Sequence, residues 1–389
     1  MPEWLFMKKG LVALAVGTFS LGISEFGMMG ILSDVASGVG VDIATAGHLV
    51  SAYSLGVAVG APMLIAMRRL PLKRLMLLLS AVIAIGNAVA AAAPGFYTLV
   101  CARFISGLPH GAFFGAGAIV CSRLADNGHG AKAVAVMIGG MAIANVAGVP
   151  AATFISNIFS WRAAFAIVMI FGVLTFAGLK VWMPFLEVSP DNGVKGQFRF
   201  LRGTAPWLIY GGVFFGQAGV YCWLSYIEPI MTGVTGFSTA DMTWVMMLVG
   251  LGMVVGNALS GRLADRYHAS LVCGFIAVAM VVVMPLIYFC SGYKVPSLVL
   301  SFLAAAALFG IGGPLQYLIV RFAKGGEMLG GAGIQIAFNV SNAFSAAIGG
   351  AAINHGLGIA SPALIGGPFA IVGAIMLFML YRDYGTRGA

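Results

Sequence analysis

Two titratable residues lie in a stretch of the sequence that otherwise consists mainly of Ala, Val, Phe, Ile, Leu and Gly. Arg103 and His110 are seven residues apart in this stretch. On an α-helix they would lie two turns apart on nearly the same face. A charged side chain inside a membrane-spanning helix is costly and is commonly functional, so this pair indicates a site if the segment crosses a membrane.

The composition indicates a protein with many membrane-spanning helices. Of its 389 residues, 60% are hydrophobic and 8% are charged, whereas about a quarter of the residues in soluble proteins are charged. The apolar residues form runs of roughly 20, the length that crosses about 30 Å of hydrocarbon as a helix. Twelve spans are predicted, at 10–31, 46–67, 73–93, 96–124, 131–156, 160–182, 204–231, 239–263, 269–291, 295–320, 328–355 and 359–381.

The positive charges indicate which loops face the cytoplasm. Of the 21 Lys and Arg residues, 18 lie in the even-numbered loops or near the two termini, while the opposite loops hold only Arg162 and Lys294. By the positive-inside rule, both termini are predicted to be cytoplasmic. The net charge of +9 therefore reflects topology and does not indicate a nucleic-acid partner. The first run lacks a small-residue cleavage site and is predicted to be a span.

The longest polar stretch of the chain divides the spans six and six. We interpret this stretch, 184–203, as a cytoplasmic linker between an N-terminal six-helix bundle, 1–183, and a C-terminal six-helix bundle, 204–389. The two parts echo one another weakly, since Gly256 follows Gly60 at an offset of 196 residues. Parallel repeats of six spans are typical of transporters with a substrate site between the halves near the middle of the membrane.

Catalysis and metal binding are not predicted. The five cysteines are odd in number and scattered, nearly all within apolar runs, so they indicate neither a disulfide framework nor a CxxC motif. The sequence contains no HExxH, GxSxG or GxxxxGK[ST] motif. We therefore expect no enzyme, no cofactor and no ATP hydrolysis. The energy for any transport would come from an ion gradient, such as the proton gradient, or from the gradient of the substrate itself.

Four motifs occur in an order that is known from one group of transporters. They are Arg103–Gly107 (RxxxG) in the fourth span, Gly148–Pro150 (GVP) in the fifth, Trp161–Phe165 at the start of the sixth, and Gly261–Tyr267 (GRLADRY) after the eighth. With these motifs the chain resembles the major facilitator superfamily, in its twelve-span drug:proton antiporter branch, and particularly the sugar-efflux and arabinose-efflux-permease-like members. The resemblance covers essentially the whole chain.

This resemblance implies an all-α integral membrane fold of two pseudo-symmetric six-helix bundles, a monomer, and export in exchange for protons. It also implies gating roles for Asp265 and Arg266 at the cytoplasmic end of the eighth span. Gly148 and Pro150, in the antiporter element of the fifth span, are also predicted to take part in gating, and a proline there favours a helix kink. The first-half copy of the loop motif departs from the family, because Arg69 stands opposite Asp265.

Proton coupling is predicted at two or three ionisable residues. Glu25 and Arg103 lie about six and seven residues inside the outer ends of their spans. We expect them to face one another across a central cavity, either as a pair that breaks when Glu25 takes up a proton or as a static ion pair. His110 is the other candidate, because imidazole titrates near neutral pH. Its alternative role is that of a packed, hydrogen-bonded histidine.

Uncharged polar residues in four spans could line the substrate cavity. Gln335, Asn339 and Asn342 recur at i, i+4 and i+7 and so share one helix face. Amides both donate and accept hydrogen bonds, which suits a hydroxylated or mixed polar substrate. The alternative is hydrogen bonding between helices. The remaining cavity candidates are Tyr53, Asn145, Gln217 and Tyr221.

The sequence therefore predicts a multi-pass secondary transporter of a bacterial inner membrane. Its partners are a small molecule such as a sugar or a drug, protons and the lipid bilayer, with no nucleic acid. Export and proton exchange rest on the resemblance. An importer of a sugar or nucleoside and a non-transporting membrane sensor or scaffold are the alternatives.

Overall fold

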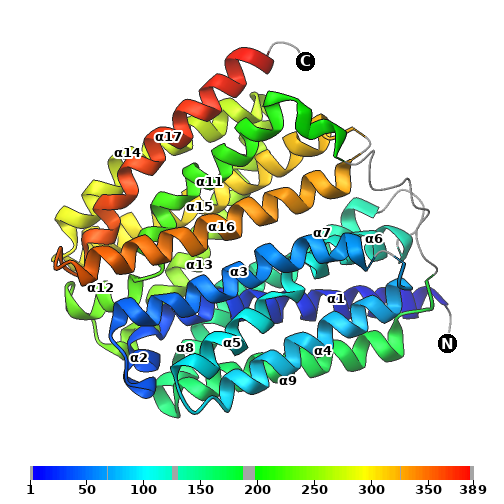
Figure 1. Cartoon of the computed structure of the whole chain (residues 1–389), viewed down its shortest axis with the longest axis horizontal. Helices are drawn as coiled ribbons and strands as arrows, with labels where there is room; N and C mark the ends of the chain where they lie inside the picture. Colours follow the sequence, from blue (N-terminus) through cyan, green and yellow to red (C-terminus); the bar gives the residue numbers. More distant parts are fainter. Residues whose placement is uncertain (1–2, 68, 125–129, 187–197, 325, 386–389) are drawn as a thin grey trace.

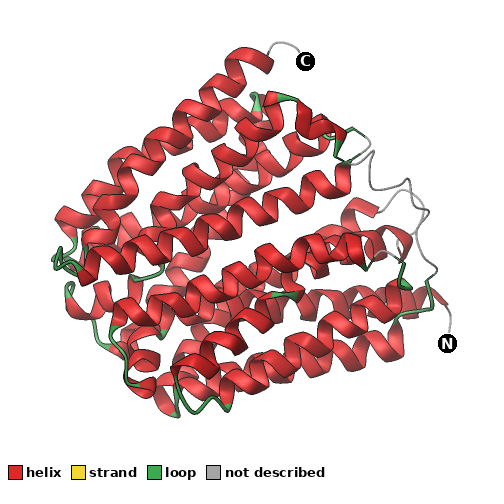
Figure 2. Cartoon of the chain, viewed as in Figure 1, coloured by secondary structure: helices red, strands yellow, loops and turns green. Residues whose placement is uncertain are grey.

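The protein is helical throughout the part of the chain that the structure describes. The computed structural model describes residues 3–67, 69–124, 130–186, 198–324 and 326–385. Within these ranges no β-strand occurs, and the helices are joined by short turns (Figure 2). The predicted all-α fold is confirmed. Most of the predicted linker, residues 187–197, lies outside the described residues.

The first half of the chain supplies one group of helices (Figure 1). In chain order they are α1 (Glu3–Phe26), the 3-10 helix η1 (Gly27–Gly30), α2 (Leu32–Val39), α3 (Ile43–Ala66), α4 (Leu72–Ala91), α5 (Phe96–Gly107), α6 (Pro109–Leu124), α7 (Gly130–Ile143), the π-helix η2 (Ala144–Gly148), α8 (Val149–Ile158) and α9 (Trp161–Trp182).

The second half supplies the other group. It consists of η3 (Arg199–Arg202), α11 (Thr204–Leu224), α12 (Ile227–Gly233), η4 (Thr239–Asp241), α13 (Met242–Arg266), α14 (Ala269–Cys290), α15 (Lys294–Phe322), α16 (Glu327–Asn354) and α17 (Ser361–Tyr384).

Among the described helical segments, 11 are long and apolar enough to cross a membrane. The remaining predicted span, 204–231, is formed by α11 and the short helix α12. With 21 residues α11 is also long enough to span, although it is not one of these 11 segments. The twelve-helix arrangement predicted from the sequence therefore holds.

Two spans are interrupted where the sequence contains proline. The fourth span divides into α5 and α6 at Leu108, because Pro109 has no N–H to donate to the preceding turn. In the fifth span, Pro150 follows a π-helical turn, η2, that contains Asn145. A π-turn inside an α-helix widens the backbone locally and frequently marks a functional position.

The weak repeat in the sequence corresponds to a repeated packing contact. Gly56 and Gly60 of α3 lie so close to the carbonyls of Phe104 and Leu108 that a Cβ atom would collide with them. In the second half, Gly252 and Gly256 of α13 lie in the same way against the carbonyls of Phe302 and Ala306. Glycine is required at these positions because the two backbones are in direct contact.

The two groups of helices form two bundles that meet at one end of the molecule (Figure 1). Between the bundles, α3 packs against α16, and α13 packs against η2 and α8. The short helices α2 and α12 also touch one another at this end. The bundles diverge toward the other end, where α1 begins (Figure 1). By the charge distribution this diverging end is cytoplasmic, so the outer end is the closed one.

Candidate functional site

Glu25 is a buried acid in the last turn of α1. Its side chain is 1% exposed, and neither carboxyl oxygen has a hydrogen-bond partner among the described residues. The nearest basic group is the imidazole of His110, with 3.7 Å between Nε2 and the carboxyl Oε2. A buried carboxylate without hydrogen bonds is costly.

His110 lies in the first turn of α6, between Glu25 and Tyr53. The Tyr53 hydroxyl lies 2.9 Å from Nδ1, and the ring stacks on Phe114 with a centroid distance of 5.3 Å. If the hydroxyl donates to Nδ1, the imidazole carries its hydrogen on Nε2, the atom that faces Glu25. The histidine is thus packed and hydrogen-bonded, as one reading of the sequence expected, and it is also the group nearest to Glu25.

Arg103 is fully buried in α5 and connects three helices. Its Nη1 donates to the Ser24 carbonyl of α1 at 2.7 Å, and its Nε donates to the Leu49 carbonyl of α3 at 3.4 Å. The guanidinium carbon lies 4.3 Å from the centre of the Tyr53 ring. Two carbonyls and an aromatic face thus take the place of a carboxylate as its partners.

The predicted direct pair of Glu25 and Arg103 is therefore not seen. In the described part of the chain no ion pair within 4.0 Å joins them, although their opposite charges attract one another. The prediction rested only on the similar distances of Glu25 and Arg103 from the outer ends of their spans. The Arg103 guanidinium instead donates a hydrogen bond to the carbonyl oxygen of Ser24, one residue before Glu25. The Glu25 carboxyl faces His110.

In the second bundle, α11 carries the polar residues Gln217 and Tyr221, both fully buried. The Gln217 Nε2 donates to the Leu308 carbonyl of α15 at 2.8 Å, while its Oε1 has no partner within the described chain. The Tyr221 hydroxyl is likewise unpaired among the described residues, and its ring meets Phe338 edge-on at 5.2 Å. Tyr221 also interacts electrostatically with Glu25 of the other bundle.

The predicted polar stripe on α16 is only partly hydrogen-bonded. Gln335 is half-buried, and its backbone carbonyl accepts a bond from Asn339 Nδ2 at 3.0 Å. The side-chain oxygen of Asn339 and both polar side-chain atoms of Asn342 are buried without partners in the residues described. In the described residues, neither asparagine side chain forms a hydrogen bond to another helix, which was the alternative role predicted for this stripe.

The fifth span is closely packed around its π-turn. The Asn145 carbonyl lies where a Cβ of Gly250 in α13 would be, so η2 and the second bundle are in backbone contact. The Asn145 side-chain oxygen has no partner in the described chain. A Cβ on Gly148 would lie 2.7 Å from Ile23, and Pro150 is buried in the first turn of α8.

The predicted gating pair Asp265 and Arg266 lies at the cytoplasmic end of α13. Both side chains are exposed, and no hydrogen bond or ion pair of either one occurs within the ranges that the structure describes. The resemblance implied that Asp265 contacts a neighbouring helix when the inner side is closed. In this structure the bundles diverge at that side (Figure 1).

Contacts that close the outer end involve residues that sequence reasoning did not select. The Ser51 hydroxyl of α3 donates to the Ala343 carbonyl of α16 at 2.8 Å. The Ser33 N–H of α2 donates to the Glu228 carboxylate of α12, also at 2.8 Å. A serine in a span and an acid near a span end are common features, so the sequence carried no signal for these contacts.

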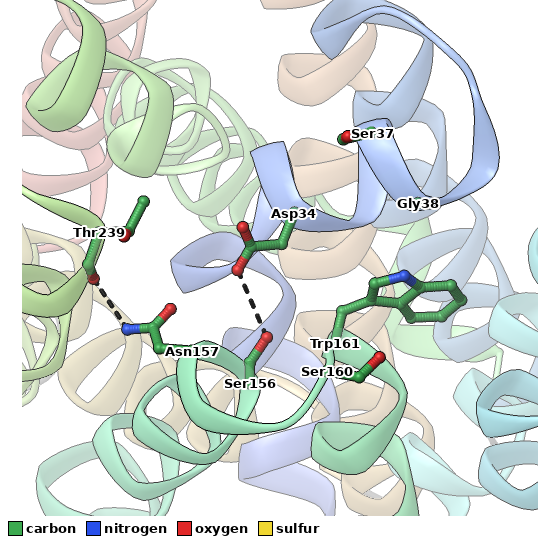
Figure 3. Close-up of a pocket in the computed structure, with 8 residues that line it drawn as sticks. All are labelled: Asp34, Ser37, Gly38, Ser156, Asn157, Ser160, Trp161 and Thr239. Carbon is green, nitrogen blue, oxygen red and sulfur yellow. Dashed lines mark hydrogen bonds between the residues drawn. The ribbon is translucent and has the colours of Figure 1, made fainter.

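An open hollow of about 310 Å³ lies at the outer end between the bundles (Figure 3). Across it, Asn157 donates to the Thr239 carbonyl at 2.8 Å, and the Ser156 hydroxyl lies 3.5 Å from the Asp34 carboxylate (Figure 3). Partial burial raises the pKa of Asp34, and the Ser156 hydroxyl opposes this. None of the predicted cavity residues lines this hollow.

Comparison with known sequences gives consistent results along the chain. Residues 14–330 match the sequence profile described as "Major Facilitator Superfamily". The chain is 43% identical to "Putative transporter AraJ" of Escherichia coli (strain K12), over 97% of this chain and 96% of that protein. It is 34% identical to "Inner membrane transport protein YdhP" of the same strain, over 96% of each.

A more distant relative and a solved structure extend this result. The chain is 27% identical to "Chloramphenicol resistance protein" of Streptomyces lividans, over 95% of each protein. The crystal structure of a bacterial homologue of the human lysosomal transporter Spinster, in an inward-facing and unoccupied conformation, superimposes with a TM-score of 0.76. It covers 98% of each chain at 15% identity, which shows a shared fold.

Proposed function

This chain belongs to the Major Facilitator Superfamily, and we propose that it exports a small molecule across the bacterial inner membrane in exchange for protons. It is a multi-pass membrane transporter and not an enzyme. The observation that carries the proposal is the Glu25 carboxyl, which is buried in α1 without a hydrogen bond among the described residues and lies 3.7 Å from His110.

Glu25 and His110 form a pair in which a proton can bind to the carboxyl or to the imidazole. Their facing atoms lie 3.7 Å apart, so a protonated His110 could form an ion pair with the Glu25 carboxylate. Arg103 holds the carbonyl of Ser24 and thereby fixes the end of α1 that carries Glu25. Proton release by this pair would leave a negative charge that favours water or a substrate in the site.

The substrate would be recognised mainly by the second bundle. Tyr221, Asn339 and Asn342 present buried polar atoms that have no protein partner in the described chain. Such atoms favour a ligand that both donates and accepts hydrogen bonds. A sugar and a polar drug both fit this description, and the name of the Streptomyces relative makes chloramphenicol a reasonable test compound.

Exchange follows if the substrate and the proton compete for Glu25. Tyr221 of the second bundle lies within electrostatic range of Glu25 of the first. A substrate that bonds to both side chains would displace the proton on one side of the membrane and be displaced by it on the other. One chain contains both bundles, so we expect a monomer, which light scattering of the purified protein would check.

A flux assay in proteoliposomes tests this function. With an imposed pH gradient, a panel of sugars, nucleosides, cationic drugs and chloramphenicol would reveal the substrate and the direction of transport. In Glu25→Gln we expect loss of transport driven by the pH gradient and retention of substrate exchange at equal pH. Asp42→Asn, which changes an exposed acid just before α3 and outside the candidate spans, is the matched control. Full pH-driven transport by Glu25→Gln would refute the proposal.

A further inference from the structure

The corner between α11 and α12 places Tyr226 of the second bundle against the first bundle. Tyr226 is fully buried, and its hydroxyl donates to the Ala346 carbonyl of α16 at 2.6 Å. The hydroxyl occupies the position that a Cβ on Gly47 of α3 would take. On the other side, a Cβ on Gly349 would lie 2.8 Å from the ring and one on Gly350 would lie 2.6 Å from the hydroxyl. Three glycines thus form a notch for one tyrosine.

Glu228, two residues later, makes a second contact between the bundles. Its carboxylate is 2% exposed and accepts the N–H of Ser33 in the first turn of α2 at 2.8 Å. A bond between a carboxylate and an N–H at a helix start is charge-assisted and favourable. The other carboxyl oxygen lies 3.4 Å from the Thr232 hydroxyl of the same helix, and Asp34 is the neighbouring charged group on α2.

We infer that the α11–α12 corner is the outer gate of this transporter, with Tyr226 and Glu228 as its two positioning residues. Both contacts join the bundles at the closed outer end, so both must break when that end opens. Neither residue belongs to the proton-coupling cluster. The inference therefore does not depend on the substrate or on the role of Glu25.

The geometry makes the gate sensitive to one added methyl group. A side chain at position 47 would overlap the Tyr226 hydroxyl, and Tyr226 cannot retreat because Gly349 and Gly350 lie against it. In the outer-closed state Gly47→Ala is therefore strained, whereas an opened gate relieves the overlap. A substitution that shifts an equilibrium in this way acts through its different energies in the two states.

The distance between spin labels at the outer end would measure the position of the gate. Tyr97, near the start of α5, is 84% exposed, and Tyr293, which precedes α15, is 67% exposed, so Tyr97→Cys and Tyr293→Cys would carry the labels. The five native cysteines would be replaced by serine in the full chain. Double electron–electron resonance in proteoliposomes then gives the fractions of the outer-closed and outer-open forms.

We expect Gly47→Ala and Glu228→Ala each to raise the ratio of open to closed protein roughly tenfold, because each removes or opposes a buried contact. Glu228→Gln keeps an acceptor oxygen for the Ser33 N–H and should shift the ratio less. Gly139→Ala is the matched glycine control, since nothing lies within 4 Å of an added Cβ there. It should leave the distances unchanged.

A combination of substitutions tests the direct contact. If Gly47 and Tyr226 meet, Gly47→Ala should add little once Tyr226→Ala has removed the ring, so the two effects should not be additive. Additive effects would show that Gly47 and Tyr226 are not in direct contact. An unchanged distance distribution in Glu228→Ala would overturn the gate, and this variant answers the question even if Gly47→Ala does not fold.

Discussion

The two bundles bury different kinds of polar side chain in their membrane-spanning helices. The first bundle buries Glu25, Arg103 and His110, which are charged or can become charged. The second buries Gln217 and Asn342, which stay neutral at any physiological pH. Apart from Glu228 near the outer surface, the buried acidic and basic side chains of the described residues belong to the first bundle. The first bundle can therefore respond to a proton deep in the membrane, while the second can offer hydrogen bonds that do not change with pH.

Buried polar atoms without a hydrogen bond occur in both bundles, but they differ in kind. In the first bundle the Glu25 carboxyl has no hydrogen bond in the described residues, while Arg103 and His110 each have a protein partner. In the second bundle both polar atoms of the Asn342 side chain lack a partner in the described residues. A buried amide without partners lowers stability. Its presence is most easily explained by a ligand that completes its hydrogen bonds.

The strongest test of this contrast removes one buried hydrogen-bonding side chain from each bundle. Arg103→Met should lower the free energy of unfolding by about 2–4 kcal/mol, because charge-assisted bonds to α1 and α3 are lost. Gln217→Leu removes one neutral bond to Leu308 and should cost about 1 kcal/mol. Thermal unfolding in the same detergent measures both. Equal losses of unfolding free energy in the two variants would contradict the proposed difference between the bundles.

Stability and transport should move in opposite directions at Asn342. Asn342→Leu replaces unpaired buried polar atoms with apolar ones, so the unfolding temperature should rise by an amount equivalent to about 1 kcal/mol. The KM for transport should increase about tenfold if the amide binds substrate. Asn354→Leu, at the exposed end of the same helix, should show neither effect. A stabilised protein with unchanged KM would place the substrate elsewhere.

Loss of the Tyr53 hydroxyl should have a smaller effect. Tyr53→Phe removes the 2.9 Å contact with His110 but keeps the ring beneath Arg103. We expect a stability loss of about 1 kcal/mol and a displaced pH profile of transport, because the imidazole loses the partner that orients it. Tyr97→Phe, an exposed tyrosine in α5, is the control. An unaltered pH profile would show that His110 does not take part in proton coupling.

The smallest effects should come from two acids outside the membrane, Asp34 and Asp42, and they should have opposite signs. Partial burial raises the pKa of Asp34, so its folded form binds the proton more tightly than the unfolded form does. Stability is then lost as the pH rises from about 4 through the raised pKa. Asp34→Asn should therefore be slightly more stable than the native protein at pH 7, and this advantage should disappear below about pH 4.

Asp42, just before α3, is expected to behave in the opposite way. Hydrogen bonds from the backbone N–H and the hydroxyl of Thr45 lower its pKa. Its contribution to stability is present above the ordinary carboxyl value of about 4 and is lost as the pH falls through the lowered pKa. Asp42→Asn should thus be slightly less stable at pH 7. Unfolding curves of both variants between pH 3 and pH 7 would show whether the signs differ.

Much of the architecture follows from local features of the sequence. Runs of about 20 apolar residues must form helices in a membrane, because only a helix satisfies its own backbone there. Pro109 and Pro150 mark interruptions of two spans for the same local reason, the missing N–H. The span that contains α11 was predicted in the same way, from its length and its place among the loops.

The side-chain partners within the site were much less predictable. Glu25 and Arg103 were matched by depth, but depth does not give the direction in which a side chain points around its helix. Arg103 turned out to bind the Ser24 carbonyl, while Glu25 lies beside His110. A guanidinium has several donors and can be satisfied by carbonyls alone, so its presence did not require a carboxylate.

The sequence by itself determined that the chain spans the membrane many times, where its polar residues lie along the helices, and which loops are cytoplasmic. Hydrophobic runs, prolines and charge distribution act locally, so they can be read without a fold. Only the tertiary structure decided that His110 faces Glu25 and that Tyr226 fills a notch at Gly47. Those contacts depend on the rotation and close approach of helices that are distant in the chain.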